Sequence, residues 1–161
     1  MALSLIDSRY QLFPRLKYGP GRTTTYRPLS RQELDTLRRT PGAIIWENSR
    51  YDATYVVDRF HLDKMMQEGK RPVVHLGQPE AVTALRHAVT TAFISVNLTC
   101  PRNIAEQRIK GRDTGDITAR LAAYDETAPL TCADLTIDTS HVEPTEAAIM
   151  IDLTCSIAVL Q

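Results

Sequence analysis

Short apolar runs alternate with helix signals along this chain, and this alternation constrains the fold more than any other feature. The runs are rich in β-branched residues and are bounded by turn residues. They span residues 43–46, 72–76, 92–98 and 134–138. Near-continuous apolar runs are typical of buried parallel strands, and strands separated by helices build layered domains. The sequence therefore predicts an α/β fold, with a mostly parallel sheet flanked by helices in three layers.

Capping signals place the helices between these runs. Ser30, with Glu33 three residues later, forms a capping-box pattern that predicts a helix to Arg39. Asp116 has the position of a cap for a helix that ends near Tyr124. The other helices are expected at 58–68, at 79–89, from Pro101 onward and at 144–153.

The length and the cysteine pattern bound the class of protein. A chain of 161 residues fits one ordinary domain, so we interpret residues 1–161 as a single domain. The three cysteines lack metal-ligand spacing, and no secretory leader opens the chain. No apolar run has the length of a membrane span. We therefore expect a cytoplasmic protein with no metal site and no membrane partner.

The charges balance in total but not along the chain. Nineteen basic and nineteen acidic residues give zero formal net charge, which argues against a nucleic-acid partner. Between Ser8 and Gln32, however, six basic residues occur without an acid. This segment favours one small polyanionic ligand. The alternative is a set of solvated charges that neutralise each other across the fold.

A second group of arginines surrounds a glycine-flanked turn. Arg108 and Arg112 lie four residues apart on one helix face, and Arg120 follows in the next helix. Guanidinium groups around a hinged connection suit a lid that closes over phosphates. The alternative is an exposed helix whose arginines pair with Glu106 or Asp113.

The motifs around these arginines occur in a definite order. A strand is followed by Cys100-Pro101-Arg102, a helix with Arg108, Arg112-Asp113-Thr114-Gly115-Asp116 and Ala119-Arg120-Leu121. This order resembles the lid of guanylate kinases and of ribose 1,5-bisphosphate phosphokinases. The resemblance implies a lid-like region at 101–124. It also implies that Arg108, Arg112 and Arg120 contact the phosphates of ATP and the transferred phosphoryl group.

An acceptor-binding region at 22–57 follows from the same resemblance. The run Arg22-Thr23-Thr24-Thr25-Tyr26-Arg27-Pro28 resembles a Thr-Thr-Arg-Pro segment, and Trp46-Glu47 followed by Arg50-Tyr51 resembles the acidic and Tyr-Gly elements. The resemblance implies that Arg22, Arg27 and Tyr51 hold the acceptor phosphate and that Glu47 reads the guanine base.

Two further segments complete the resemblance. His75-Leu76-Gly77-Gln78 is closer to the ribose bisphosphate branch and makes His75 a candidate acceptor residue. Asp138-Thr139 matches the segment where the family places the adenine edge, which implies a cofactor contact.

The phosphate-cradling loop of this family does not occur in the sequence. That loop is a strand followed by Gly-x-x-x-x-Gly-Lys-Ser/Thr. Gly19-Pro20-Gly21 is the glycine-rich loop of this chain, and it lacks a Gly-Lys pair. ATP and magnesium are therefore the expected cofactors only if the chain is an active kinase, and otherwise none is expected.

Without that segment, the first strand of the sheet is missing or replaced. Two apolar runs are candidate replacement strands, Ala2 to Ile6 and Cys155 to Leu160, and the second is favoured. Either run could come from the same chain or from a partner, which would make a homodimer.

The leading hypothesis is a guanylate-kinase-like protein that binds a phosphorylated small molecule, a nucleotide or a sugar phosphate. Without the P-loop it is impaired in catalysis or has a changed function. One alternative is an ATP-dependent phosphotransferase whose P-loop lies outside this chain. The other is a non-catalytic protein-binding module.

Overall fold

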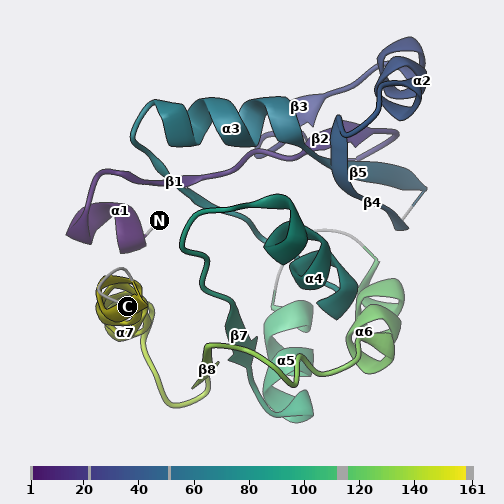
Figure 1. The fold of residues 1–161 in the computed structure, drawn as a ribbon. Coiled ribbons are helices and arrows are strands. Elements are labelled where there is room, and N and C mark those ends of the chain that lie inside the picture. Colours follow the sequence, from purple (N-terminus) through teal and green to yellow (C-terminus); the bar gives the residue numbers. More distant parts are fainter. Residues whose placement is uncertain (1, 22, 51, 112–115, 159–161) are drawn as a thin grey trace.

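The computed structural model describes residues 2–21, 23–50, 52–111 and 116–158, in which helices and short strands alternate (Figure 1). The helices are α1 (Ala2–Ile6), α2 (Arg31–Arg39), α3 (Arg59–Gln67), α4 (Pro79–Ala88), α5 (Arg102–Lys110), α6 (Ile117–Glu126) and α7 (Pro144–Ala158). The strands are β1 (Tyr10–Leu12), β2 (Leu16–Tyr18), β3 (Arg27–Pro28), β4 (Ile44–Arg50), β5 (Ala53–Asp58), β6 (Arg71–Val73), β7 (Val96–Thr99) and β8 (Leu135–Asp138). None of the helices in these ranges has the length and apolar character needed to cross a membrane.

The strands form one mixed sheet and two parallel pairs. The mixed sheet has the order β3-β2-β5-β4, and the parallel pairs are β1-β6 and β7-β8. The predicted α/β class is therefore confirmed. The prediction of a parallel strand at 43–46 is wrong, because this run belongs to β4, which pairs antiparallel with β5. β4 ends at Arg50 and β5 begins at Ala53, and strands that follow each other so closely in sequence pair antiparallel.

The predicted helix starts are confirmed by their caps. The Ser30 hydroxyl accepts from the Glu33 backbone, and the Glu33 carboxylate accepts from the Ser30 backbone, which completes the capping box. Asp58 caps α3 by accepting from the backbone of His61. Asp116 caps α6 by accepting from the backbone of Ala119. Each cap satisfies amide groups that the first helical turn leaves unpaired.

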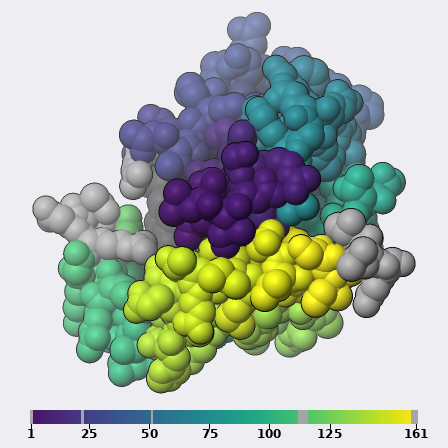
Figure 2. Space-filling view, turned by 90° about the vertical axis from the view of Figure 1, so that its left-hand side faces the viewer, coloured from purple at the N-terminus to yellow at the C-terminus, as the bar shows by residue number. Residues whose placement is uncertain are grey.

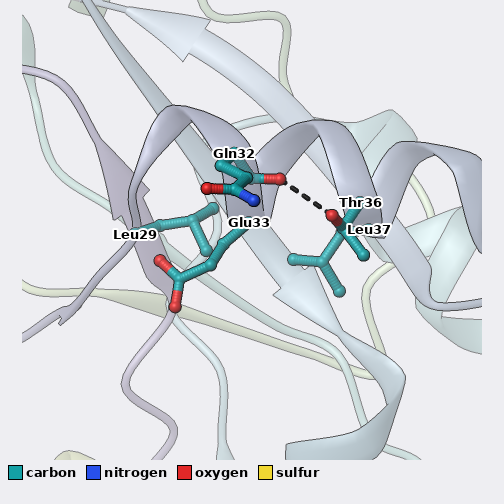
Figure 3. A pocket seen from close by; sticks show the side chains of 5 residues that line it. All are labelled: Leu29, Gln32, Glu33, Thr36 and Leu37. Atoms are coloured by element: carbon teal, nitrogen blue, oxygen red, sulfur yellow. Dashed lines mark hydrogen bonds between the residues drawn. The ribbon is translucent and has the colours of Figure 1, made fainter.

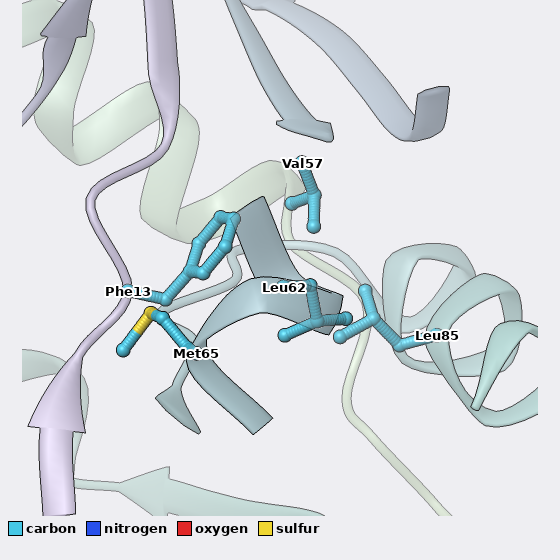
Figure 4. Close-up of a cluster of buried hydrophobic side chains, with 5 residues drawn as sticks. All are labelled: Phe13, Val57, Leu62, Met65 and Leu85. Atoms are coloured by element: carbon cyan, nitrogen blue, oxygen red, sulfur yellow. The ribbon is translucent and has the colours of Figure 1, made fainter. Parts of the chain in front are cut away.

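One buried cluster joins the mixed sheet to helices α3 and α4 (Figure 4). Phe13 comes from the segment after β1, Val57 from β5, Leu62 and Met65 from α3, and Leu85 from α4. Because these side chains come from four segments, their burial fixes the relative placement of the layers.

The N-terminal helix packs against the C-terminal helix (Figures 1 and 2). Leu3, Tyr10 and Ala148 form the buried centre of this contact. The Tyr10 hydroxyl donates to the Asp152 carboxylate at 2.8 Å and accepts from Arg71 at 3.1 Å. Burial raises the pKa of Tyr10, so this hydroxyl keeps its proton and its role as a donor.

Both predicted replacement strands are wrong. Residues Ala2–Ile6 form α1, and the described part of the run from Cys155 belongs to α7. Their buried residues follow the helical period, with Ala148, Ile151 and Cys155 on the side of α7 that packs against Leu3. In the described ranges, β6 has a single hydrogen-bonded neighbour, β1, and β7 has a single neighbour, β8.

Candidate functional site

Two cations and two tyrosines gather on one face of the mixed sheet. The Tyr26 and Tyr55 rings lie 5.3 Å apart, centroid to centroid. The Arg15 guanidinium carbon lies 5.8 Å from the Tyr26 centroid and 5.1 Å from that of Tyr55. The Lys17 ammonium lies 5.9 Å and 5.8 Å from the same two centroids. We call these four residues the cation–tyrosine cluster.

The strand register produces this cluster. Lys17 on β2 lies directly opposite Tyr55 on β5, so their side chains share a face. Arg15 and Lys17 are two residues apart, and residues at this spacing in extended backbone project to the same side. Lys17 is buried and donates to the carbonyl of Pro20. The fold therefore directs two positive charges to one pair of rings.

The Arg15 guanidinium of this cluster is available to an anion. Within the described part of the chain it has no ion pair, and its contacts are the two rings. Two like charges at one place repel each other, and a bound anion relieves that repulsion. A guanidinium also matches the geometry of phosphate oxygens.

His75 lies within reach of the charge of Arg15. Its side chain is open to solvent, yet the surrounding protein is dense enough that desolvation lowers its pKa below 6.5. The positive charge of Arg15 lowers that pKa further. His75, a predicted site residue, therefore lies close enough to Arg15 for this charge to affect its pKa.

Arg27 and Glu47, also predicted acceptor residues, lie on the other face of the same sheet. Glu47 is aligned with Val56, which is aligned with Leu16, which is aligned with Arg27. This row faces α2, whose Leu34 is buried against Leu16 and Val56.

Both of these side chains have protein partners. Arg27 forms an ion pair with Asp58 and donates through Nε to the Pro14 carbonyl at 2.9 Å. Glu47 accepts from Arg38 of α2. The structure therefore does not bring either residue together with the cation–tyrosine cluster.

The lid-like helices are held to the ends of β7 and β8. Arg108 donates to the Thr139 hydroxyl at 2.8 Å and to its carbonyl at 2.6 Å. The structure thus brings a predicted lid arginine to the predicted cofactor segment. Hydrogen bonds from Ser140 lower the pKa of the neighbouring Asp138 carboxyl. Arg120 lies on α6, and α6 is tied to α5 by the Arg102–Asp125 ion pair.

Three predicted site residues, Arg22, Tyr51 and Arg112, lie outside the described residues. Arg15, Lys17, Tyr26 and Tyr55 are not among the predicted site residues. The spacing of Arg15 and Lys17 is a signal that could have found them, had β2 been recognised as a strand.

The glycine-rich loop does not fit a phosphate cradle. Gly19 and Gly21 have positive φ angles and lie between β2 and β3, so no helix start follows them. A Cβ on Gly19 would approach the Asp52 carbonyl oxygen to 2.7 Å, which explains the glycine there. A P-loop instead leads into a helix whose amides bind the phosphates. The loop thus serves as a tight connection.

Two surface hollows are lined by residues outside the cation–tyrosine cluster. The hollow in Figure 3 is formed along α2 by Leu29, Gln32, Glu33, Thr36 and Leu37. The other lies beside β1 and α3 and includes His61, Lys64 and Lys70. Neither hollow contains a predicted site residue, so we do not assign the site to them.

A solved structure decides the fold type. The chain matches the crystal structure of guanylate kinase from Anaplasma phagocytophilum with a TM-score of 0.69 and 13% sequence identity, over 99% of this chain and 81% of that one. The fold is guanylate-kinase-like. No family model matches the sequence, and no curated protein matches it either.

The guanylate-kinase-like fold gives the three parts of the chain their arrangement. The mixed sheet carries the cation–tyrosine cluster, the described strands β1-β6 and β7-β8 pair apart from it, and Arg108 ties α5 to the segment that follows β8. At this level of identity the match establishes the architecture, and the ligand has to be argued from the side chains themselves.

Protonation of His75 is expected to destabilise the protein as the pH falls. The pKa of His75 is lower in the folded state than its ordinary value of 6.5, so the unfolded chain binds the proton more readily. The contribution of His75 to the free energy of unfolding is therefore present above about pH 6.5, and it is lost as the pH falls below that value. We expect His75→Gln to reduce the fall in melting temperature between about pH 7.5 and about pH 5.5. The exposed residue His87, changed to Gln, is the control. An unchanged fall in His75→Gln would contradict this expectation.

Proposed function

We propose that this protein binds a phosphorylated small molecule at the cation–tyrosine cluster. The convergence of Arg15 and Lys17 on the Tyr26–Tyr55 pair carries the proposal. A phosphate monoester supplies the negative charge that Arg15 lacks among the described residues, and guanidinium–phosphate hydrogen bonds are among the strongest in proteins. The tyrosine rings offer an apolar surface to the remainder of the ligand.

The proposal is for binding, because the described residues supply no phosphate cradle for ATP. The glycine-rich loop leads to β3, and Arg108 is hydrogen-bonded to Thr139. Phosphoryl transfer depends on electrostatic stabilisation of the transferring group, which a cradle and its metal ion normally provide. The chain thus has a kinase-like architecture in which ligand recognition is the best-supported activity.

Titration calorimetry of the full chain with ribose 5-phosphate tests this function. Arg15→Met keeps an unbranched side chain over the rings but removes the charge, so we expect binding to weaken at least tenfold. The estimate follows from about 1.5–3 kcal/mol for a hydrogen bond to a charged group. Arg31→Met is the control, since Arg31 is exposed and pairs with Asp35 on α2. Unchanged binding in Arg15→Met, or an equal loss in Arg31→Met, would contradict the proposal.

A further inference from the structure

A small hollow lies between β1 and α3, the second of the two hollows described above. Leu12 and Pro14 line it from β1 and the segment that follows, and Met65 lines it from α3. These three side chains form its apolar wall. The volume of the hollow is about 280 Å³, just under the usual range of roughly 300–1,000 Å³ for ligand sites. Ligand sites are mostly apolar and contain a few polar groups that orient the ligand. The hollow therefore has the size and the wall for a small organic molecule.

The helical period brings polar groups to the same hollow. His61, Lys64 and Glu68 have the spacing i, i+3 and i+7, so they share one face of α3 and its C-terminal cap. The His61 ring packs against the Phe13 ring, with 5.4 Å between their centroids. Phe13 belongs to the buried cluster of Figure 4. The imidazole is therefore supported from behind by the core.

The turn after α3 adds a second lysine. The Gly69 amide donates to the Met66 carbonyl, and the Lys70 amide donates to the Met65 carbonyl. These two hydrogen bonds form a Schellman motif, for which Gly69 supplies the positive φ of 73°. The motif reverses the chain and brings Lys70 to the hollow. There the Lys70 ammonium donates to the Glu68 carboxylate at 2.6 Å.

The charged groups of the hollow sum to one positive charge at neutral pH. The hydrogen bond from Lys70 lowers the pKa of Glu68, so this carboxylate stays ionised and the two charges cancel. Desolvation lowers the pKa of His61 below its ordinary value of 6.5, so the imidazole is neutral. Lys64 has no ion pair within the described ranges of the chain. Its ammonium therefore supplies the uncompensated charge.

This charge favours a carboxylate over a phosphate. A carboxylate carries one negative charge at pH 7, which equals the uncompensated charge of Lys64. A phosphate monoester carries about 1.5–2 negative charges at that pH, and the Glu68 carboxylate repels the excess. We propose that this hollow is a second binding site, for a small monocarboxylate with an apolar body. Lys64 binds the carboxylate, and the apolar body lies against the apolar wall. The cation–tyrosine cluster shares no residue with this site.

An NMR titration of the full chain with hexanoate at about pH 7 tests the site. We expect the ring signals of His61 to shift and to saturate, with a dissociation constant of roughly 1–10 mM for so small a ligand. Hexylamine and 1-hexanol have the same apolar chain without a negative charge. Each should bind at least about fivefold more weakly. Equal binding of 1-hexanol, or shifts that do not saturate, would overturn the proposal.

Two variants should change hexanoate binding in opposite directions. Lys64→Met keeps an unbranched side chain without the charge and should weaken binding about fivefold. Glu68→Gln removes the competing carboxylate, so binding should tighten about threefold or more. Lys110→Met is the control, because Lys110 pairs with Glu106 on α5. Unchanged binding in Lys64→Met, or an equal loss in Lys110→Met, would show that the hollow does not bind the carboxylate.

Two further measurements separate this site from the phosphate site of the proposed function. Lys64→Met should bind ribose 5-phosphate as the wild type does, and Arg15→Met should bind hexanoate as the wild type does. Loss of hexanoate binding in Arg15→Met would place hexanoate at the cation–tyrosine cluster and overturn the proposal. If butyl phosphate shifts the His61 signals at lower concentration than hexanoate, the assignment to a monocarboxylate is wrong. Failure of ribose 5-phosphate to bind overturns the proposed function and leaves the hexanoate test intact.

Discussion

Leu85→Ala is expected to lower the free energy of unfolding by about 3 kcal/mol, within the range for large core truncations. Leu85 is 1% exposed and belongs to the cluster that joins α4 to α3 and β5. Its truncation removes apolar contacts and leaves a cavity among side chains from several layers. For a chain of this length the melting temperature should fall by roughly 10 °C.

Urea unfolding measures this effect, with Trp46 as the probe. Trp46 is the one tryptophan of the sequence, and it packs against the same cluster. Leu5→Ala is the matched control, because Leu5 is 87% exposed and should change stability by no more than about 0.5 kcal/mol. Equal losses in the two variants would show that Leu85 is not packed in the cluster with Phe13 and Val57.

The helices could be predicted because their signals are local. Ser30 and Glu33 are three residues apart, and Asp116 lies beside the helix that it caps. By contrast, β1 and β2 have three residues each, and β1 pairs with residues about sixty positions away. A three-residue strand has too few positions to show an alternating pattern, so only its distant partner identifies it.

The terminal runs illustrate the ambiguity of short apolar segments. Ala2–Ile6 and the run from Cys155 are apolar enough for strands. The sequence therefore makes each of them a candidate for the missing first strand of the sheet. Periodicity alone does not separate a buried strand from a buried helix over so few residues. The packing of Leu3 and Ala148 against each other favours helices, because it buries one side of each segment.

The candidate site depends on which face of the sheet each side chain occupies. The sequence alone did not reveal these faces. A shift of one residue moves a side chain to the opposite face of a sheet. The resemblance implies that Glu47 reads the base, and the register places Glu47 on the face opposite the cation–tyrosine cluster, where it pairs with Arg38. Charge patterning did indicate the basic segment that contains Arg15 and Arg27. Charge patterning could not distinguish Arg15, which contacts the tyrosine rings, from Arg27, which forms an ion pair with Asp58.

The Arg27–Asp58 pair is the second place where we expect a large effect. Asp58 is 4% exposed, caps α3 and pairs with Arg27. Asp58→Ala removes the cap and leaves the Arg27 charge without its partner, which should cost about 3 kcal/mol. Asp58→Asn keeps an oxygen for the cap and should cost less. Urea unfolding of Asp58→Ala, Arg27→Met and the double variant gives the coupling between the two residues, which should be at least about 1 kcal/mol.

The same variants decide between two roles for Arg27. If Arg27 stabilises the junction of β3 and α3, Arg27→Met should lose about 2 kcal/mol of stability. It should still bind ribose 5-phosphate within about twofold of the wild type, well below the tenfold change that corresponds to 1.4 kcal/mol. Arg15→Met should show the opposite pattern, because Arg15 has its ring contacts and no ion pair within the described ranges. If Arg27→Met instead loses binding while its stability is unchanged, Arg27 is the residue that binds the phosphate, as the family resemblance implies. The phosphate would then lie beside Asp58 at the start of α3, and the cation–tyrosine cluster would need another explanation.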